Sequence, residues 1–494
     1  MSGKVYLVGG GPGEVGLFTE KGRRVLAEAD CILYDRLVNN QLLAGAEGAE
    51  LIYAGKKPGD HFRSQKQINE LLLERARAGE IVVRLKGGDP LLLGRGGEEA
   101  LYLAERDVDF EIVPGISSSL AAPAYAGIPL THRDYSSSLA IITGHRREDE
   151  EVEIPRADTL VILMGVKNIR ELMQKAQEKG YSSDTPAAII SRATTPRQRV
   201  TVGEVGNLPE LVEENNISPP AVVVVGEVVE LRSELNFFEQ KPLFGRKVLL
   251  TRPPSKSGDL RRRLVDAGGE VIEFPTVELE PASTEEIDRY LDRLAEYRDL
   301  IFTSSRGVEI FMNRLFERSD ARQLAGKNIS AIGPVTAGRL EKYGIKADFV
   351  PEEYRAEALL NFFPEDLAGR KVLLPRSDVA RDVLPERLGE KGAEVDVLPV
   401  YRQLVSEPEN KSAVHSGGFD IITFTSSSTA ENFFKITNDE KAHKLLAEVL
   451  VCCIGPITAR TLRKQGIEPD IIADEYTTEG LFRALVDKLK GEDL

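Results

Sequence analysis

The chain has 494 residues, of which 41% are hydrophobic and 29% charged, a length and composition typical of a soluble globular protein with roughly three or four domains. Its formal net charge of −15 at pH 7 argues against a nucleic-acid partner, because phosphate binding depends on an excess of Lys and Arg. We expect a cytoplasmic protein without membrane partners, since no apolar run approaches the roughly 20 residues that span a bilayer and no signal peptide pattern opens the chain.

The first predicted strand, residues 4–8, runs into a glycine-rich segment. Residues 11–16 fit the spacing G-x-G-x-x-G and Asp35 follows about 20 residues later, as in dinucleotide-binding folds. In those folds the helix begins within the glycines, so that its amides meet a pyrophosphate. Here Pro12 removes one amide and the helical pattern begins only near Thr19, a good N-cap. We therefore reject a nicotinamide dehydrogenase.

Residues 82–100 form the most distinctive stretch. A short apolar strand with two basic residues breaks at Gly87-Gly88-Asp89-Pro90 and continues through more glycines into a predicted helix. Glycines allow a backbone to lie against a flat ligand, and Pro90 ends the strand by removing a donor. The pattern indicates a ligand-binding turn between strand and helix, although a connection that merely turns the chain fits equally well.

Eight motifs, in order over about residues 3–240, carry a family resemblance. They are VYLVGGGPGE (5–14), YDRLV (34–38), AGK (54–56), VVRLKGGDPLLLGRGGEEA (82–100), VPGISS (113–118), AYAGIPLTHRDYSSS (124–138), TGH (143–145) and LMGV (163–166). Together they closely resemble uroporphyrinogen-III C-methyltransferase, the branch of the tetrapyrrole methylases that makes precorrin-2. Eight ordered motifs are far more specific than any one of them.

The resemblance implies a two-domain methylase fold, with α/β domains at 1–116 and 117–240 and S-adenosylmethionine in the cleft between them. The implied cofactor contacts are Pro12, Gly87, Gly88, Asp89, Leu92, Ser117, Ser118, Met164 and Ala193. Asp89 can accept hydrogen bonds from ribose hydroxyls or the methionine ammonium, and glycine and serine amides can serve a carboxylate or adenine. Met164 offers a soft contact to a ring, but core packing would also explain it.

The same resemblance implies Asp35 as proton acceptor and Lys56 as proton donor. Both follow short apolar strands, where α/β folds place ligands, but a carboxylate there is also often a helix cap. The chemistry needs no metal, because a reduced pyrrole carbon attacks the sulfonium methyl and the enzyme supplies orientation and a proton site. The substrate carries eight carboxylates, and its expected basic contacts are Arg36, Arg95, His132 and Arg133.

The three cysteines do not suggest another chemistry. Cys31, Cys452 and Cys453 allow neither a disulfide framework nor a metal cluster, because adjacent cysteines rarely share one ion. We expect all three to be small buried hydrophobic residues. The sequence therefore predicts no metal site.

After a linker at about 236–244, the chain contains an internal repeat. The recurring pairs are KVLLTRP (247–253) with KVLLPRS (371–377), FTSS (302–305) with FTSS (424–427), and AIGPVTA (331–337) with CIGPITA (453–459). Apolar strands alternate with amphipathic stretches in both copies, which predicts two similar α/β units with parallel sheets.

The Thr-Ser-Ser and Gly-Pro-x-Thr-Ala turns of this repeat lie just after strands and just before helices. They offer hydroxyls and free amides at helix N-termini, an arrangement that binds anions without Lys or Arg. If only one such turn were present, an N-capping role would be the first explanation. Paired turns in both copies favour a functional role.

Residues 244–490 resemble uroporphyrinogen-III synthase through these motifs, LPVYRQL (398–404) and the terminal IIADEYTTEGL. The resemblance implies one domain from 244–276 with 404–490 and another from 279–402, joined by a two-stranded linker. The sequence alone fits two tandem units equally well.

The implied reaction dehydrates hydroxymethylbilane, inverts its last ring and closes the macrocycle. Tyr401 matches the position favoured for assisting loss of hydroxide, although a partly buried linker tyrosine explains it equally well. The implied carboxylate contacts are Thr303, Thr336, Ser426 and Thr458. Arg252 and Arg376 are weaker candidates for the same role.

The sequence thus predicts a bifunctional enzyme that forms uroporphyrinogen III from hydroxymethylbilane and methylates it at C2 and C7 to precorrin-2, for sirohaem or cobalamin synthesis. A homodimer through the methylase half is expected from the resemblance. One alternative is a methylase of a later corrin precursor. Another makes the C-terminal half a non-catalytic tetrapyrrole-binding module.

Overall fold

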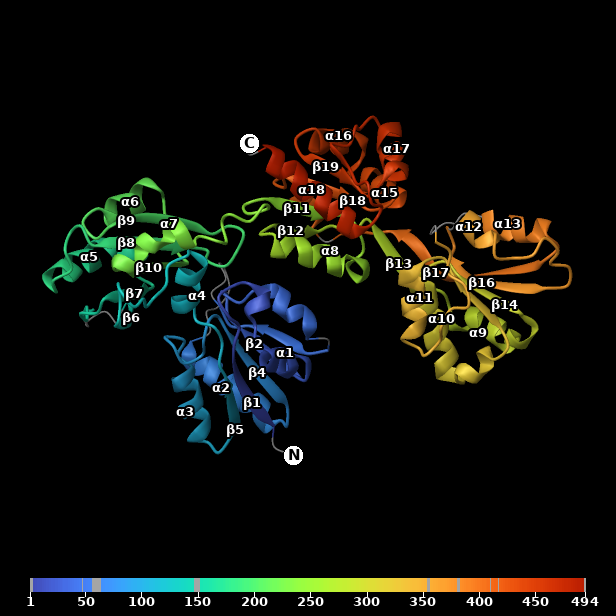
Figure 1. Ribbon diagram of the computed structural model, residues 1–494. Coiled ribbons are helices and arrows are strands. Elements are labelled where there is room, and N and C mark those ends of the chain that lie inside the picture. The colour runs from blue at the N-terminus through green and yellow to red at the C-terminus, as the bar shows by residue number, and fades with distance from the viewer. Residues whose placement is uncertain are drawn as a thin grey trace. The chain divides into compact units, whose positions relative to one another are not determined.

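The computed structural model of the chain describes residues 3–46, 48–55, 64–145, 152–352, 356–379, 383–408, 410–415 and 417–492. Lys56, the predicted proton donor, lies outside the described residues. The chain divides into two compact units, 1–248 with 262–271 and 486–494, and 249–261 with 272–485. Both are α/β, which confirms the predicted fold class (Figure 1). Among the described helices, none combines the length and apolarity needed to cross a bilayer.

The first sheet is parallel throughout, with strand order β3-β2-β4-β1-β5. Its strands are β1 (Lys4–Gly9), β2 (Cys31–Tyr34), β3 (Glu50–Tyr53), β4 (Ile81–Lys86) and β5 (Asp109–Val113). The accompanying helices are α1 (Glu20–Ala27), α2 (Gln65–Arg77) and α3 (Gly96–Ala104). Thr19 caps α1 as predicted, since its side chain accepts from the Gly22 amide. All carboxyl ends lie at one edge, which gathers the loops after β1, β2, β4 and β5.

The second sheet is mixed, with order β6-β7-β10-β8-β9, and β10 runs antiparallel to both of its neighbours. Its strands are β6 (Leu139–Thr143), β7 (Thr159–Leu163), β8 (Pro186–Ser191), β9 (Arg199–Glu204) and β10 (Ala221–Val225). The helices here are α4 (Ser118–Tyr125), α5 (Ile169–Glu178), α6 (Leu208–Glu214) and α7 (Arg232–Leu235). The central strands β7, β8 and β10 are almost entirely buried, as expected of near-continuous apolar runs.

Two further sheets form the C-terminal half, and strands of one sequence repeat are divided between them. One sheet has the order β12-β11-β18-β19-β20, with β11 (Lys247–Leu250), β12 (Glu270–Glu273), β18 (Ile421–Phe424), β19 (Leu450–Cys453) and β20 (Ile471–Ile472). Helices in these parts of the chain are α8 (Pro254–Asp266), α14 (Lys411–His415), α15 (Ser427–Thr437), α16 (Asp439–Leu446), α17 (Pro456–Lys464) and α18 (Thr478–Glu492).

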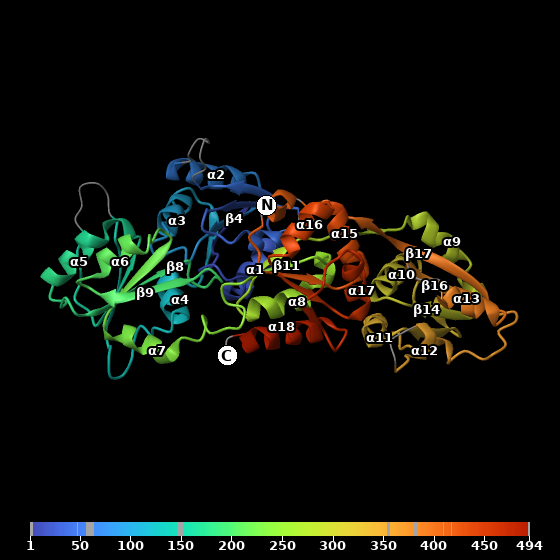
Figure 2. The same cartoon turned by 90° about the horizontal axis from the view of Figure 1, so that it is seen from above.

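The other sheet has the order β13-β17-β16-β14-β15, with β13 (Val277–Pro281), β14 (Asp299–Phe302), β15 (Asn328–Ala331), β16 (Lys371–Ser377) and β17 (Glu394–Val405). Its helices are α9 (Thr284–Asp292), α10 (Ser305–Arg318), α11 (Pro334–Glu341), α12 (Ala356–Leu360) and α13 (Val383–Glu390). The antiparallel pair β13 and β17 lies side by side in both ribbon views (Figures 1 and 2).

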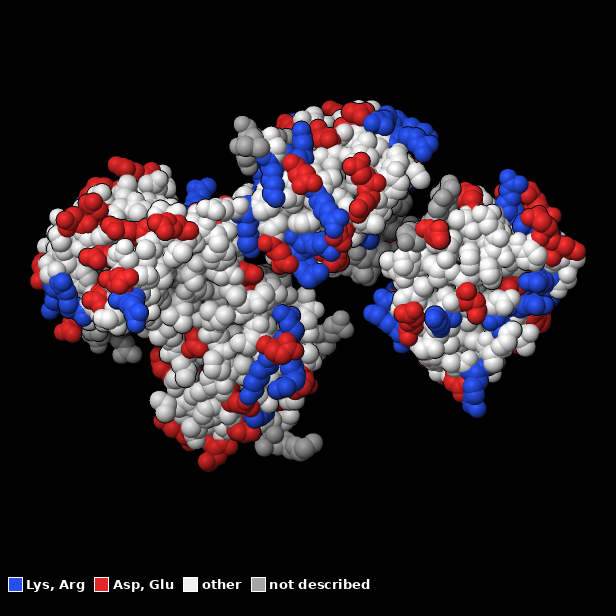
Figure 3. Space-filling model, viewed as in Figure 1, with Lys and Arg blue, Asp and Glu red and all other residues white. Residues whose placement is uncertain are grey.

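The two sheets have equivalent aromatic cores, as the sequence repeat predicts. Phe302 and Phe311 have ring centroids 5.6 Å apart in one core, and Phe424 and Phe433 are also 5.6 Å apart in the other. Both pairs meet edge to face, the favoured geometry for aromatic rings. Acidic and basic side chains are interspersed over the face of the molecule drawn in Figure 3.

Candidate active sites

Three loops at the carboxyl edge of the first sheet meet backbone to backbone. The Gly88 amide donates to the Gly11 carbonyl at 2.8 Å, and the Gly11 amide donates back to Gly88 at 3.2 Å. A Cβ atom on Gly9 would lie 2.5 Å from the Gly115 nitrogen, and one on Gly115 would overlap the Gly88 carbonyl. Only glycine fits this junction, where the loops after β1, β4 and β5 approach as closely as backbones can.

Asp89 organises these loops. Its Oδ1 accepts from the amides of Leu91 and Leu92 at 2.8 and 3.0 Å, and its Oδ2 accepts from the Gly115 amide at 3.1 Å. A carboxylate can accept about four hydrogen bonds, so capacity for one ligand donor is left. The structure therefore gives Asp89 a loop-forming role besides the ligand contact that the sequence suggests.

The Ser117 and Ser118 turn begins α4. Ser117 is buried and caps the helix by accepting from the Ser119 amide at 3.3 Å. The Ser118 amide lies in the first helical turn, where backbone amides lack intrahelical partners. A Cβ atom built on Gly88 would lie 3.8 Å from that nitrogen. These predicted cofactor residues are thus brought together, with Leu92 half-buried beside them.

The Pro12 turn is held by residues that follow strands of the first and the second sheet. The Asn39 side-chain amide donates to the Gly13 carbonyl at 2.7 Å, and the Glu14 amide donates to Thr194 Oγ1 at 3.2 Å. Tyr125 also donates to Glu14 at 2.5 Å, and the pKa of Tyr125 is raised first by burial and then by this carboxylate. A Cβ atom built on Gly13 would lie 3.5 Å from the Ala193 carbonyl, so Ala193 adjoins this turn.

Met164 follows β7 and is not a core residue. Its side chain is 54% exposed and its φ is 57°, a conformation that non-glycine residues rarely adopt and that clusters at functional sites. Core packing, the alternative left open by the sequence, is therefore wrong. Positive φ angles also occur at Leu93, Arg95, Arg192 and Thr194, in the loops after β4 and β8.

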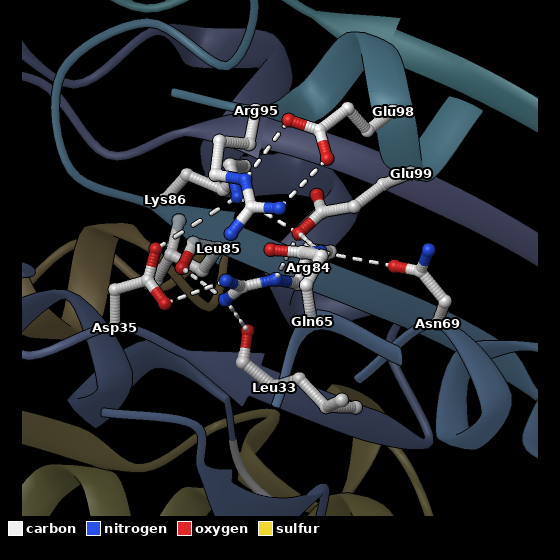
Figure 4. A network of polar contacts seen from close by, with 10 residues as sticks. All are labelled: Leu33, Asp35, Gln65, Asn69, Arg84, Leu85, Lys86, Arg95, Glu98 and Glu99. Atoms are coloured by element: carbon white, nitrogen blue, oxygen red, sulfur yellow. Dashed lines mark hydrogen bonds and ion pairs between the residues drawn. The ribbon is translucent and has the colours of Figure 1, made fainter. Parts of the chain in front are cut away.

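A buried cluster of charges surrounds Asp35; we call Asp35, Arg84, Lys86 and Glu99 the Asp35 cluster (Figure 4). Arg84 donates through Nη2 to Asp35 Oδ1 at 2.6 Å and through Nε to Glu99 Oε1 at 3.2 Å. Lys86 Nζ donates to the same Glu99 oxygen at 2.9 Å and lies 3.9 Å from Asp35 Oδ2. Burial lowers the pKa of Lys86, and the neighbouring Arg84 lowers it further.

Arg84, Lys86 and Glu99 are not among the site residues predicted from the sequence. The Arg84 side chain is 2% exposed and that of Glu99 is 0% exposed, whereas the Asp35 side chain is 31% exposed. Charged residues inside an otherwise apolar strand are a readable signal, because ionised side chains are almost never buried unless they are paired. Their partners on α3 and after β2 could not be read from the strand itself.

The predicted basic contacts of the methylase half are only partly brought together. Arg95 lies beside the Asp35 cluster and forms a two-pronged ion pair with Glu98 (Figure 4). The polar and ring contacts of His132 are instead within its own turn, with Asp134 and Tyr135. The other two residues, Arg36 and Arg133, are exposed.

The repeated turns of the C-terminal half fall into two kinds. Ser304 and Ser426 cap α10 and α15, accepting from the amides of Gly307 at 3.0 Å and Thr429 at 3.2 Å. The Gly-Pro turns begin α11 and α17 without any side-chain cap, and Thr336 and Thr458 are buried in their first turns. The Gly-Pro turns therefore leave their helix amides without side-chain acceptors, whereas the serine turns supply their own. Thr303 is half-buried beside Ser304.

Tyr401 lies within a strand of this half, and Arg252 lies just after another strand. Tyr401, in β17, is 3% exposed and donates its hydroxyl to Ser304 Oγ at 3.2 Å. Arg252 follows β11, and within the described part of the chain its buried Nε and Nη1 atoms have no hydrogen-bond partner. Burial lowers the pKa of this guanidinium. A half-buried guanidinium with two such nitrogens is well suited to a carboxylate ligand.

Comparison with known families matches both halves of the chain. Residues 4–209 match the family described as Tetrapyrrole (Corrin/Porphyrin) Methylases. Residues 258–483 match Uroporphyrinogen-III synthase HemD. The two matches together take in the methylase loops, the Asp35 cluster and the paired turns of the repeat.

Similar proteins match one half or the whole chain. A Porphyrin biosynthesis protein HemD of Ruminiclostridium josui is 38% identical over 499 residues, which covers 98% of each chain. A uroporphyrinogen-III C-methyltransferase of Bacillus subtilis is 42% identical over 69% of this chain and 72% of its own length. An S-adenosyl-L-methionine-dependent uroporphyrinogen III methyltransferase of Methanosarcina barkeri is 47% identical over 47% of this chain and 94% of its own length. The chain therefore belongs to the proteins that join a tetrapyrrole methylase to a uroporphyrinogen-III synthase.

Proposed function

We propose that the N-terminal half methylates uroporphyrinogen III at C2 and C7 with S-adenosylmethionine, giving precorrin-2, and that the C-terminal half makes uroporphyrinogen III from hydroxymethylbilane. The names of the relatives support both activities. The structural observation that carries the proposal is the glycine junction beside the Asp35 cluster, because it brings three closely packed loops and a fixed carboxylate together at one sheet edge.

The residues at this edge fit S-adenosylmethionine. Pro12, Gly87, Gly88, Leu92 and Ala193 form the loops, and Asp89, Ser117 and Ser118 supply one acceptor and helix-terminal donors. Met164 presents an exposed thioether that suits an aromatic base. The bound donor supplies an electrophilic methyl group on a sulfonium; a carbon–carbon bond forms as the carbon–sulfur bond breaks, and its electron pair stays on sulfur.

Asp35 accepts the proton that the macrocycle must release after its ring carbon has gained the methyl group. Its carboxylate is partly exposed and is held at 2.6 Å by Arg84, so it faces the edge in one orientation. Lys56 is assigned as the proton donor by resemblance alone. Arg95, drawn beside the Asp35 cluster in Figure 4, is assigned to a substrate carboxylate, and Arg36, His132 and Arg133 are further candidates.

In the C-terminal half, we assign the uncapped turns with Thr336 and Thr458 to substrate carboxylates, with Arg252 as a cationic contact. Thr303 and Ser426 are assigned more weakly, because the serine turns are already capped by their own side chains. The Tyr401 hydroxyl is assigned to protonate the departing hydroxide, which leaves as water. The last ring is then inverted, and ring closure joins the bound chain with release of one proton, which restores the Tyr401 hydroxyl.

The proposal also covers the domain boundaries and the oligomeric state of the protein. We assign residues 244–276 with 404–490 and residues 279–402 as two synthase domains, and 1–116 and 117–240 as two methylase domains. This agrees with the distribution of strands among the sheets. We also propose a cytoplasmic homodimer formed through the methylase half.

The deciding experiment incubates the whole chain with hydroxymethylbilane and S-adenosylmethionine and follows products by mass. We expect uroporphyrinogen III without the methyl donor and a product with two added methyl groups when it is present. Consumption of added uroporphyrinogen III but not of hydroxymethylbilane would favour a non-catalytic C-terminal module. No methylation of uroporphyrinogen III would favour a later corrin precursor.

A further inference from the structure

Glu99 stands out among the buried charges because three donors converge on one of its two oxygens. Its Oε1 accepts from Arg84 Nε at 3.2 Å, from Lys86 Nζ at 2.9 Å and from Gln65 Nε2 at 3.0 Å (Figure 4). Its Oε2 is buried and has no hydrogen-bond partner among the described residues. Burying a carboxylate in this way is costly unless cations are paired with it, as Arg84 and Lys86 are here.

The charges of the Asp35 cluster balance only when Glu99 is included. Arg84 and Lys86 are two cations, and both approach Asp35, at 2.6 and 3.9 Å. Two cations beside one carboxylate hold it in its ionised form and weaken it as a proton acceptor. Glu99 carries the second negative charge and lies closer to Lys86 than Asp35 does.

We propose that Glu99 is a positioning residue for methyl transfer: it neutralises one of the two buried cations, so that Asp35 stays fixed by Arg84 yet remains basic enough to accept the released proton. The inference rests on the proposed role of Asp35. It assigns to α3 a function in the reaction that is distinct from cofactor or substrate contact.

The groups around the carboxylates of Asp35 and Glu99 come from four parts of the chain. Strand β4 contributes Arg84 and Lys86, and α2 contributes the neutral Gln65, which also bonds to Asn69. On α3 itself, the nearest other charges are Arg95 and Glu98, which are paired with each other. On the Asp35 side, Arg36 is exposed, and Lys56 lies outside the described residues. Glu99 is therefore the anion that faces both cations from α3.

Three variants of the whole chain test the charge balance: Glu99→Gln, Lys86→Met and the double variant. The readout is the pH profile of single-turnover methylation of uroporphyrinogen III at saturating donor. Loss of Glu99 leaves excess positive charge beside Asp35. We expect the acidic limb of the profile, where the rate falls at low pH, to move down by about one pH unit, with a lower plateau rate. Loss of Lys86 leaves excess negative charge and moves the acidic limb of the pH profile to higher pH by a similar amount. The double variant restores neutrality and returns the limb toward wild type.

Opposite shifts that cancel in the double variant are not expected from mere loosening of the fold. Carboxylates of the substrate titrate alike in every variant, so differences between variants report the protein. Glu105→Gln, on the C-cap of the same helix with a 70% exposed side chain, is the matched control and leaves the limb in place. Calorimetry with S-adenosylhomocysteine checks that each variant keeps its donor site, with affinity changed by no more than a few-fold.

Shifts in the same direction for Glu99→Gln and Lys86→Met, or no shift in either, would overturn the inference. Should Glu99→Gln fail to fold, Lys86→Met and the double variant decide the question, because the limb moves up in one and returns in the other. Asp35→Asn separates the two levels of the proposal. Unchanged turnover in Asp35→Asn would overturn the role of Asp35, whereas lost turnover without opposite shifts would overturn only the role of Glu99.

Discussion

The two halves of the chain prepare for anionic tetrapyrroles in different ways. The methylase half buries three charged side chains behind one sheet edge and leaves a fourth, that of Asp35, partly exposed. The synthase half offers mainly helix-terminal amides and hydroxyls, with Arg252 as a half-buried cation. In the functions that we propose, the methylase site fixes one carboxylate as a proton acceptor, whereas the synthase site mainly holds a flexible carboxylated chain in shape, for which neutral dipoles suffice. The difference follows from the chemistry that each half performs.

The largest effect is expected from Arg84→Met, which tests whether the methylase site depends on buried charges. If buried charges build the methylase site, removing Arg84 leaves Glu99 and Asp35 undercompensated and lowers the free energy of unfolding of this half by about 3 kcal/mol. Methyl transfer is lost and synthase turnover is kept. The measurement is denaturant unfolding together with both activity assays. Arg95→Met, which removes the exposed pair with Glu98, changes the same free energy by less than about 1 kcal/mol. Equal effects of the two variants would contradict the distinction.

Gly115→Ala tests whether the backbone junction is as important as the charges. The added methyl group overlaps the Gly88 carbonyl and crowds Gly9, so we expect a loss of about 2 kcal/mol in stability and weakened binding of S-adenosylhomocysteine by calorimetry. Gly45→Ala is the control, because a Cβ there meets nothing within 4 Å. Unchanged affinity in a folded Gly115→Ala protein would show that donor binding does not depend on this junction.

Tyr401→Phe probes the synthase half. Loss of the bond to Ser304 lowers the free energy of unfolding by about 1 kcal/mol, and formation of uroporphyrinogen III slows while the chain stays folded. Tyr343→Phe provides a matched loss, since that hydroxyl bonds to Asn313 at 2.7 Å on the surface, and it leaves synthase activity unchanged. Full activity of a folded Tyr401→Phe variant would remove this hydroxyl from the mechanism and leave a synthase site of dipoles alone.

The smallest expected effect concerns a serine turn of the methylase half that binds a carboxylate of the chain itself. Asp158 accepts from the Ser137 amide, the Ser137 hydroxyl and the Ser138 amide at 2.8 to 2.9 Å, and these bonds lower its pKa to about 2. Because the folded pKa is depressed, the stabilisation is present above the ordinary value of 3.8 and is lost as pH falls through about 2.

Asp158→Asn should therefore be less stable than wild type near pH 6, and the difference should shrink as the pH falls from about 4 toward 2. Thermal unfolding across this range measures it, and Asp184→Asn, an exposed site, is the control. If the stability difference does not vary with pH, the Ser137 turn does not favour the ionised carboxylate. That result would weaken the proposal that the synthase turns bind substrate carboxylates.

Local patterns predicted the sheets well. The strands around residues 4–8 and 371–377 were readable from apolar runs bounded by turn residues, and the structure places them at Lys4–Gly9 and Lys371–Ser377. The three cysteines are buried, as expected. These features depend on neighbouring residues and on the period of apolar side chains, both of which the sequence contains.

What the sequence could not supply is tertiary. The partners of Arg84 lie on other elements, so its ion pairs depend on how strands and helices stack. The exposure of Met164 depends on a positive φ that its residue type disfavours. The burial of Tyr401 depends on the pairing of β17 with both β13 and β16.

The division of each sequence repeat between two sheets affects how the chain folds during synthesis. Strands β11 and β12 leave the ribosome early, but their neighbour β18 follows only after every strand of the other sheet has been made. During that interval β11 lacks its neighbour β18, and contacts so distant in sequence form slowly. The methylase half has no such delay, since the strands of its two sheets are made before β11 begins. Nascent chains halted just after β17 should therefore carry a protease-resistant front half and a vulnerable segment around β11.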